Sequence, residues 1–195
     1  HHAVRFCNAM SELFELEPAY EIHDSMLGVH VRWKGLNCAG FRLPTAAEWQ
    51  YACSAGGDEQ RYGDLESIAW HGDNSDGHPH PVGRKQANDW GLFDMLGNVE
   101  NWVWDYAPEE GDEQPPRRDS ILRMTGGASP PVEQVDPTGP SHGNLRVSCG
   151  DGFSSRELEE SDNDQFVRRF RSAAQRFRQP GDTSAVCGLR LARSS

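Results

Sequence analysis

The sequence predicts an α+β fold that is rich in loops, with two helices and short, twisted antiparallel strands. Gly 20, Pro 12 and Trp 6 are high counts for 195 residues, and they are typical of loops packed around a few large aromatic side chains. A capping box marks the start of one short helix. Strand-like alternation runs over only a few positions at a time. The length suits one domain, residues 1–195.

The N-terminal part predicts a helix followed by a hairpin. Apolar residues recur at helical spacing from Val4 to Phe14, so we expect an amphipathic helix over residues 3–14, with Pro18 after its end. Apolar and polar residues alternate in residues 19–22 and 29–33, which lie on either side of Gly28. This pattern is typical of a small β-hairpin.

The second helix is predicted over residues 46–53. Pro44 bars a helix before it, and Thr45 can cap the helix because Glu48 stands at the third helical position. Gly56 and Gly57 end the helical pattern. Residues 58–90 contain Gly, Asp, Asn, His and Pro throughout, so we expect a long ordered loop there.

The remaining strands are predicted at residues 99–104 and 121–125, with another pair near the C-terminus that includes residues 188–193. Residues 126–145 are rich in Pro, Gly and Ser and are interpreted as a connection inside the domain. Residues 156–164 are polar and predict an exposed loop or a frayed helix.

Charge and cysteine content exclude several classes of protein. The net charge of −11 argues against binding to nucleic acid or to anionic membranes, and no apolar run is long enough to span a bilayer. The five arginines of residues 168–178 form either a local basic groove or a solvated surface. The five cysteines are widely spaced and odd in number, which favours reduced thiols and a cytoplasmic location. We expect the protein to be bacterial.

Four motifs occur in a fixed order: Phe41-Arg-Leu-Pro-Thr-Ala-Ala-Glu-Trp-Gln-Tyr51, residues 88–99, residues 136–147 and Cys187-Gly-Leu-Arg-Leu-Ala-Arg193. This series resembles the formylglycine-generating enzyme (sulfatase-modifying factor) family over nearly the whole chain. The resemblance implies a C-type lectin-like fold. Family domains carry further strands before the segment that matches residues 3–14, and the first strand pairs with the last. We therefore expect the rest of a longer protein, or another chain, to supply a partner for residues 188–193.

The resemblance also implies where the family's chemistry would lie. In its enzymes a pair of cysteines binds copper(I), and a substrate cysteine is oxidised to formylglycine. The two positions hold Ser155 and Glu160 here, and neither can supply the soft thiolate that copper(I) prefers. Cys149 has no cysteine nearby in the sequence to pair with. Formylglycine generation is therefore not expected, and the sequence favours a protein that is not an enzyme.

Iron is not expected either. The related iron-dependent sulfoxide synthases take three histidines from a helical domain that this chain does not contain. His71, His78 and His80 cluster in the sequence, but Pro79 favours extended backbone between two of them. We expect their side chains to diverge in a solvated loop.

Calcium is the better-motivated ion. It would have a structural role, and the oxygens of Gly-containing turns would bind it. By resemblance, the first loop would use the side chain of Asp94, the carbonyls of Gly97 and Val99, and Asn101, where the family usually has Glu. The second loop would use the carbonyls of Ile68 and Asp76 with the side chain of Asn74. The alternative is that both loops are Gly/Asn turns held by their own hydrogen bonds.

The favoured function is a non-catalytic ligand-binding or regulatory module, which makes the chain a pseudoenzyme with a protein or peptide ligand. The framework motifs match the family, whereas residues 148–153 and 156–164 do not. The variable proteins of diversity-generating retroelements share this scaffold. The candidate ligand-binding residues are Phe153, Ser155, Arg168, Arg169, Arg171 and Arg176. Two alternatives remain: a metal-dependent oxidoreductase of formylglycine-generating or sulfoxide-synthase type, completed by residues outside this chain, and a structural domain of a larger signalling protein.

Overall fold

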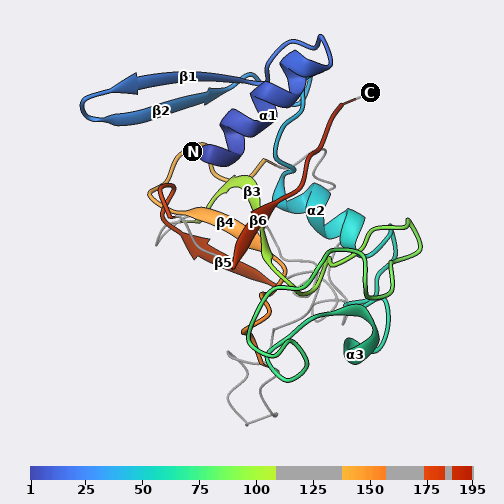
Figure 1. Ribbon diagram of the computed structural model, residues 1–195. Coiled ribbons are helices and arrows are strands. Elements are labelled where there is room, and N and C mark those ends of the chain that lie inside the picture. Colours follow the sequence, from blue (N-terminus) through green and yellow to red (C-terminus); the bar gives the residue numbers. More distant parts are fainter. Residues whose placement is uncertain (109–137, 157–173, 183–185, 195) are drawn as a thin grey trace, which may run out of the picture. The chain divides into compact units, whose positions relative to one another are not determined.

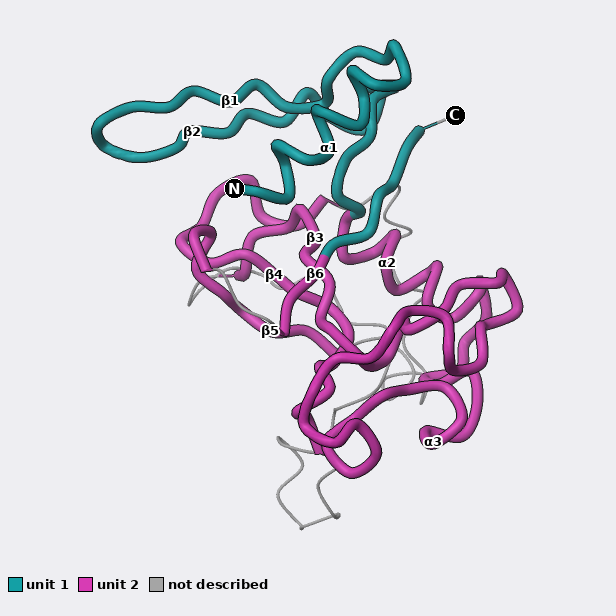
Figure 2. Tube along the Cα trace, in the orientation of Figure 1, with its two compact units in different colours: residues 1–44, 189–195 teal, residues 45–188 magenta. Residues whose placement is uncertain are grey.

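A computed structural model describes residues 1–108, 138–156, 174–182 and 186–194. The chain divides into two compact units (Figure 2). Unit 1 comprises residues 1–44 and 189–195, and unit 2 comprises residues 45–188. None of the described helices has both the length and the apolar character needed to cross a membrane.

Unit 1 contains the predicted helix and hairpin. Helix α1 (His2–Leu13) buries Val4, Cys7 and Ser11 on one face, which confirms the helical spacing of the sequence. Strands β1 (Tyr20–Ser25) and β2 (Gly28–Trp33) pair antiparallel and form the expected hairpin (Figure 1).

The Ser11 hydroxyl ties α1 to the segment before the capping box. It donates to the Cys7 carbonyl at 2.9 Å and accepts from the backbone N–H of Phe41 at 2.8 Å. A Cβ at Gly40 would lie 2.1 Å from the Glu17 carbonyl oxygen and 2.9 Å from Ser11 Oγ. Glycine is therefore required at this close approach of two backbone segments.

Helix α2 (Ala46–Cys53) opens unit 2 and confirms the predicted capping box. The Glu48 backbone N–H donates to Thr45 Oγ1 at 3.1 Å, and the Thr45 N–H donates to Glu48 Oε2 at 2.8 Å. Trp49 and Cys53 face the core, each 1% exposed. The core around them is built from buried residues of the helix, the following loops and the sheet: Ala46, Trp49, Cys53, Leu65, Ile68, Ala69, Met95, Leu96, Val103, Val147 and Cys149.

The four-stranded sheet has the order β5-β4-β3-β6 (Figure 1). Strand β3 (Glu100–Tyr106) pairs antiparallel with β4 (Arg146–Cys149), and β4 pairs antiparallel with β5 (Gln175–Arg178). Strand β6 (Cys187–Leu189) lies beside β3 at one end of this order. Residues 99–104 and the C-terminal pair were predicted as strands; β4 was not, because nearly all of it is buried and the sequence shows no alternation.

The C-terminal strand is shorter than residues 188–193. After β6, only Ala192 forms a further described bridge, with Arg42. The predicted strand at residues 121–125 lies outside the described residues. That the rest of a longer protein supplies an additional strand stays a prediction.

Residues 58–90 are mostly loop, as expected, but they contain a short helix that was not predicted, α3 (Leu65–Ile68). Asn88 fixes this region to helix α2. Its Nδ2 donates to the carbonyls of Ala52 at 2.7 Å and Cys53 at 3.1 Å, at the C-terminal end of the helix. Its Oδ1 accepts from the N–H groups of Trp90 and Leu92. One buried amide thus caps a helix and closes a turn.

The other end of α2 is met by a buried carboxylate of β3. Asp105 Oδ2 accepts from the backbone N–H of Ala46 at 2.7 Å, and Asp105 is 6% exposed. Burial raises the pKa of the Asp105 carboxyl to about 6, although this hydrogen bond and the charge of Arg146 oppose the shift. Folded Asp105 therefore holds its proton at a pH where the unfolded chain has lost it.

We predict that unit 2 loses stability as pH rises from about 4 to about 6, because over this range the folded state binds more protons at Asp105 than the unfolded state does. A shift of about two pKa units corresponds to about 3 kcal/mol. Urea unfolding of the wild type and of Asp105→Asn across this range measures the effect. The asparagine keeps an acceptor for Ala46 and does not titrate, so the wild type should lose stability relative to it as pH rises. Parallel pH curves for the two proteins would contradict the prediction.

Candidate functional site

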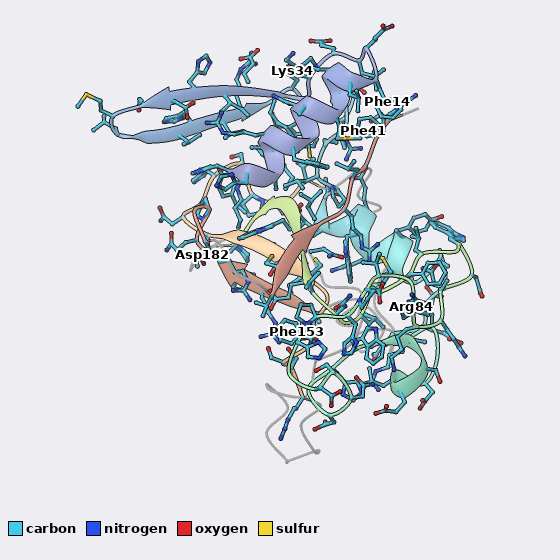
Figure 3. All side chains as sticks on the ribbon, viewed as in Figure 1. Phe14, Lys34, Phe41, Arg84, Phe153 and Asp182 are labelled. Atoms are coloured by element: carbon cyan, nitrogen blue, oxygen red, sulfur yellow. The ribbon has the colours of Figure 1, made fainter. Side chains whose placement is uncertain are left out.

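Ser155, which stands where the family has its first copper-binding cysteine, lies in a turn that is anchored by hydrogen bonds. We call this turn, residues 152–156, the Ser155 turn. Phe153 donates its backbone N–H to the Asn98 carbonyl at 2.7 Å, and its carbonyl accepts from the Ser75 hydroxyl at 2.7 Å. The Ser155 carbonyl accepts from the Gly72 N–H at 2.6 Å. Figure 3 labels Phe153, whose exposed fraction is 9%. The turn is therefore fixed to residues 72–75 and to the segment before β3.

Asn98 joins the segments around this turn. Its backbone has a φ of 67°, which an asparagine tolerates better than most residues do. Its N–H donates to the Trp70 carbonyl at 2.9 Å. Its side chain accepts from the N–H of His80 and donates to the carbonyl of His80, each at 2.9 Å. Together with the bond to Phe153, these contacts bring three loop segments to one residue.

A buried set of charges lies beside the Ser155 turn; we call it the Glu100 network. Its members share hydrogen bonds or ion pairs: Glu100, Ser148, Asp151, Ser155, Arg176 and Arg178. The side chains of Glu100 and Asp151 are 4% and 1% exposed. Two buried carboxylates face two partly exposed guanidinium groups, so the charges balance.

Glu100 is the centre of this network. Arg178 binds it through two parallel contacts, Nε to Oε2 at 2.8 Å and Nη2 to Oε1 at 2.7 Å. The Ser148 hydroxyl donates to Oε2 at 2.7 Å, and Arg176 Nε lies 3.3 Å from Oε1. Hydrogen bonding to Glu100 also raises the pKa of Arg178. The sheet makes this possible, because alternate residues of β5 share a face and Ser148 lies opposite Arg176.

Arg176 links the network to the turn. Its Nη2 pairs with Asp151 Oδ1 and lies 3.3 Å from Ser155 Oγ. The Ser155 hydroxyl therefore lies against a guanidinium group that two carboxylates already bind. Ser155 itself is 8% exposed.

The thiols near this network are held in the neutral form. Burial raises the pKa of Cys149 well above its usual range, with the charges of Asp105 and Glu100 adding to the effect. Burial, assisted by Glu100, raises the pKa of Cys187 to about 12. The thiolate is the form of cysteine that binds metals and attacks substrates. Neither thiol is in that form at neutral pH, and no disulfide joins any of the chain's cysteines.

The predicted ligand-binding residues fall into two groups. Phe153, Ser155 and Arg176 meet at the Ser155 turn, where the first two are buried and Arg176 is one-third exposed. Arg168, Arg169, Arg171 and Glu160 lie outside the described residues. Sequence reasoning missed Glu100, Ser148, Asp151 and Arg178. The available signals were the alternate arginines of residues 176–178 and a glutamate at the first position of the family's Trp-Glu-Trp segment.

Arg156 is a further residue that the sequence analysis did not single out. Its side chain is 70% exposed at the end of the Ser155 turn, and its Nε lies 3.3 Å from Asp73 Oδ1. It is the last described residue before the segment that contains Arg168, Arg169 and Arg171.

The first predicted calcium loop is partly filled by hydrogen bonds. Asp94 has a φ of 55°, and its Oδ2 accepts from the Gly83 N–H at 2.8 Å. Its Oδ1 is buried and has no hydrogen-bond partner among the described residues. Asn101 Oδ1 accepts from the indole Nε1–H of Trp49 at 3.1 Å, and Asn101 Nδ2 donates to the Val99 carbonyl at 3.4 Å.

The second predicted calcium loop is held by the Asn74 amide. Its Oδ1 accepts from the N–H of His71 at 2.8 Å, and its Nδ2 donates to the Ala69 carbonyl and to Glu66. The Ile68 carbonyl lies 3.5 Å from the Tyr62 hydroxyl. Within the described parts of the chain, no three His, Cys, Asp or Glu side chains are grouped so that they could hold a metal ion.

The histidines of this loop differ from expectation. The rings of His78 and His80 lie 4.6 Å apart, so the prediction that Pro79 makes them diverge is wrong. His80 stacks on Trp70 at 3.8 Å, and this stacking turns it inward. His71 is buried, with Nε2 3.0 Å from Glu66 Oε1, so the loop is not simply solvated.

A sequence profile of the sulfatase-modifying factor enzyme 1-like domain matches residues 1–195. The formylglycine-generating enzyme of Thermomonospora curvata is 29% identical over 185 residues, covering 84% of this chain and 54% of that protein. Chaperone protein LppX of Paenibacillus barcinonensis is 30% identical over 138 residues, covering 53% of this chain and 49% of that protein. The chain thus spans about half the length of these relatives.

Further similarities come from a larger protein and from solved structures. Serine/threonine-protein kinase pkn1 of Chlamydia caviae is 29% identical over 187 residues, 91% of this chain but 25% of the kinase. The structure of Treponema denticola variable protein 1 matches with a TM-score of 0.72 and 27% identity, covering 98% of this chain and 67% of that one. CarF matches with a TM-score of 0.64 at 24% identity, which shows similarity of fold alone.

We predict that Glu100→Ala destabilises unit 2 by about 3–5 kcal/mol, because it leaves two arginines beside a buried site without their shared carboxylate. Urea unfolding measures the loss. Glu21→Ala is the matched control: Glu21 also forms a two-contact pair with an arginine, Arg32, but at an exposed position of the hairpin. The control should leave the urea midpoint unchanged. Equal effects of the two substitutions would show that the Glu100 network is not a structural centre.

Proposed function

The chain belongs to the sulfatase-modifying factor enzyme 1-like domain family and has its C-type lectin-like fold, and from this premise we propose that it is a non-catalytic binding module. The ligand we propose is an acidic segment of a protein or peptide. The binding face consists of the exposed end of the Ser155 turn and the arginines that follow it in the sequence: Arg156, Arg168, Arg169 and Arg171.

The contact between Ser155 and Arg176 is the observation that carries this proposal. Ser155 stands at the first copper-binding position implied by the resemblance. A guanidinium group lies 3.3 Å from its hydroxyl and is paired with Asp151. A permanently cationic, donor-only group opposes a metal cation at this point. The second position is Glu160 in the sequence. A copper(I) ion at this site would thus find neither of the two thiolates and would be repelled by the charge of Arg176.

The rigidity of the turn supports a binding role. Asn98, Ser75 and Gly72 hold the backbone of Phe153 and Ser155, so the exposed side chains of Ser154 and Arg156 stand on a fixed base. A pre-ordered base lowers the entropy lost when a ligand binds. The arginine-rich segment is a cationic region in a chain of net charge −11, which favours an acidic ligand over a basic one.

Two finer statements belong to the same proposal. A cytoplasmic location fits the odd number and wide spacing of the cysteines. Calcium at the second loop, on the carbonyls of Ile68 and Asp76 and the side chain of Asn74, is the other finer statement, and its support is the resemblance of the motif.

One alternative has a specific observation in its favour. The chain matches about a quarter of the length of a protein kinase, which is what a domain of a larger signalling protein would show. In that case the domain is an element of regulation, and its ligand is another part of the same protein. An oxidoreductase completed by residues outside this chain is the remaining alternative.

The catalytic question is tested with copper(I) under anaerobic conditions, in competition with a chelator. The wild type should bind no copper and should not convert a cysteine peptide to an aldehyde, as read by mass spectrometry. The variant carrying both Ser155→Cys and Glu160→Cys should bind more copper than the wild type, because two soft ligands are restored although Arg176 still opposes the ion, whereas each single variant should not. Stoichiometric copper in the wild type would favour the oxidoreductase.

The binding face is tested by selecting peptides on the immobilised domain from a random library. We expect acidic peptides, with binding reduced at least tenfold by replacing Arg168, Arg169 and Arg171 with alanine. The control replaces three arginines elsewhere, Arg5, Arg84 and Arg193, and changes the net charge equally. Equal losses in the two variants would show a non-specific charge effect and contradict the proposed face.

A further inference from the structure

The orientation of the Asn101 amide is fixed by a core residue. The Trp49 indole nitrogen can only donate, and it is buried with its residue 1% exposed. It donates to Asn101 Oδ1 at 3.1 Å. Turning the amide over would place its NH2 group against the indole N–H and leave two buried donors facing each other. The oxygen of Asn101 must therefore face Trp49.

The opposite end of the amide then faces the backbone. Asn101 Nδ2 donates to the Val99 carbonyl at 3.4 Å. For one cation to bind both Asn101 and Val99, the two oxygens would have to converge on it. Here a nitrogen donor, and not Oδ1, is the atom directed at the Val99 oxygen. Asn101 and Val99, two of the four residues expected by resemblance to bind calcium, are thus hydrogen-bonded to each other.

The remaining groups do not make up a calcium site. Calcium takes roughly six to eight oxygens in proteins, several of them from carboxylates. Asp94 supplies one carboxylate: its Oδ2 already accepts from Gly83, which leaves Oδ1 as the one carboxylate oxygen of these residues that an ion could bind. The residues of this loop therefore do not fit a bound calcium ion, despite the similarity of the motif.

We infer that the Asn101 amide replaces the cation in this loop. It links the Trp49 indole of helix α2 to the Val99 carbonyl just before β3, and so occupies two of the oxygens that a cation would bind in this loop. The loop before β3 is accordingly independent of calcium, and a carboxylate at position 101 would restore the requirement. This inference concerns a structural loop and does not rest on the proposed binding function.

The test compares the wild type with Asn101→Glu. Thermal melting is measured in calcium chloride and in EDTA, and calcium binding is measured by calorimetric titration. Asn101→Glu should melt lower in EDTA, because a second carboxylate joins Asp94 in a buried loop. Calcium at about 100 times its dissociation constant should raise its melting temperature by about 5–10 °C. Asn101→Gln is the matched control, equal in length but uncharged, and should show no response to calcium.

The wild type decides the inference even if the glutamate variant fails to fold. No calcium response at all supports it. A response that persists in Asp94→Asn places the ion elsewhere, at a site such as the second loop, and also supports it. A wild-type response that Asp94→Asn abolishes would overturn it, as would a folded Asn101→Glu variant that binds no calcium.

Discussion

The constraint on which unit 2 depends is that its buried loop backbone must be hydrogen-bonded. Strands and helices satisfy their own amides, but most of residues 54–99 is neither. Asparagine side chains supply the missing partners because a carboxamide carries the same donor and acceptor as a peptide group. Asn88 caps helix α2, Asn98 pairs with both backbone groups of His80, and Asn74 closes the turn after α3. The loops are ordered because these amides replace secondary structure.

Whether a feature could be predicted from the sequence depends on whether its contacts are local or distant in the chain. Helix α2 and the β1–β2 hairpin follow from neighbouring residues, since a capping box and a Gly-centred turn are local signals. The contacts of Glu100 with Ser148 and Arg178 span 48 and 78 positions, and strand β4 likewise pairs with strands that are distant in the sequence. No local pattern encodes such contacts. The family resemblance placed Ser155 at the site. It could not show that Arg176 lies against it, because the arginine is brought there by the register of β4 and β5.

The Glu100 network also changes how the site is to be understood. A cysteine lost from a metal site would leave an unfilled polar position, whereas Ser155 lies in a set of buried charges that balance one another. Such a set stabilises one arrangement of β3, β4 and β5 and is costly to disrupt. The described part of the site is therefore a completed structural element, and its chemical role is to hold the sheet and the turn in register.

The hydrogen bonds that fix the Ser155 turn use the backbone atoms of Phe153 and Ser155. Their geometry does not depend on which side chains the exposed positions 154 and 156 carry. Side chains at these two positions can therefore change without breaking the hydrogen bonds that fix the turn. For the proposed binding role this means that the side chains available to a ligand and the atoms that stabilise the turn are different, so recognition could evolve on an unchanged main chain.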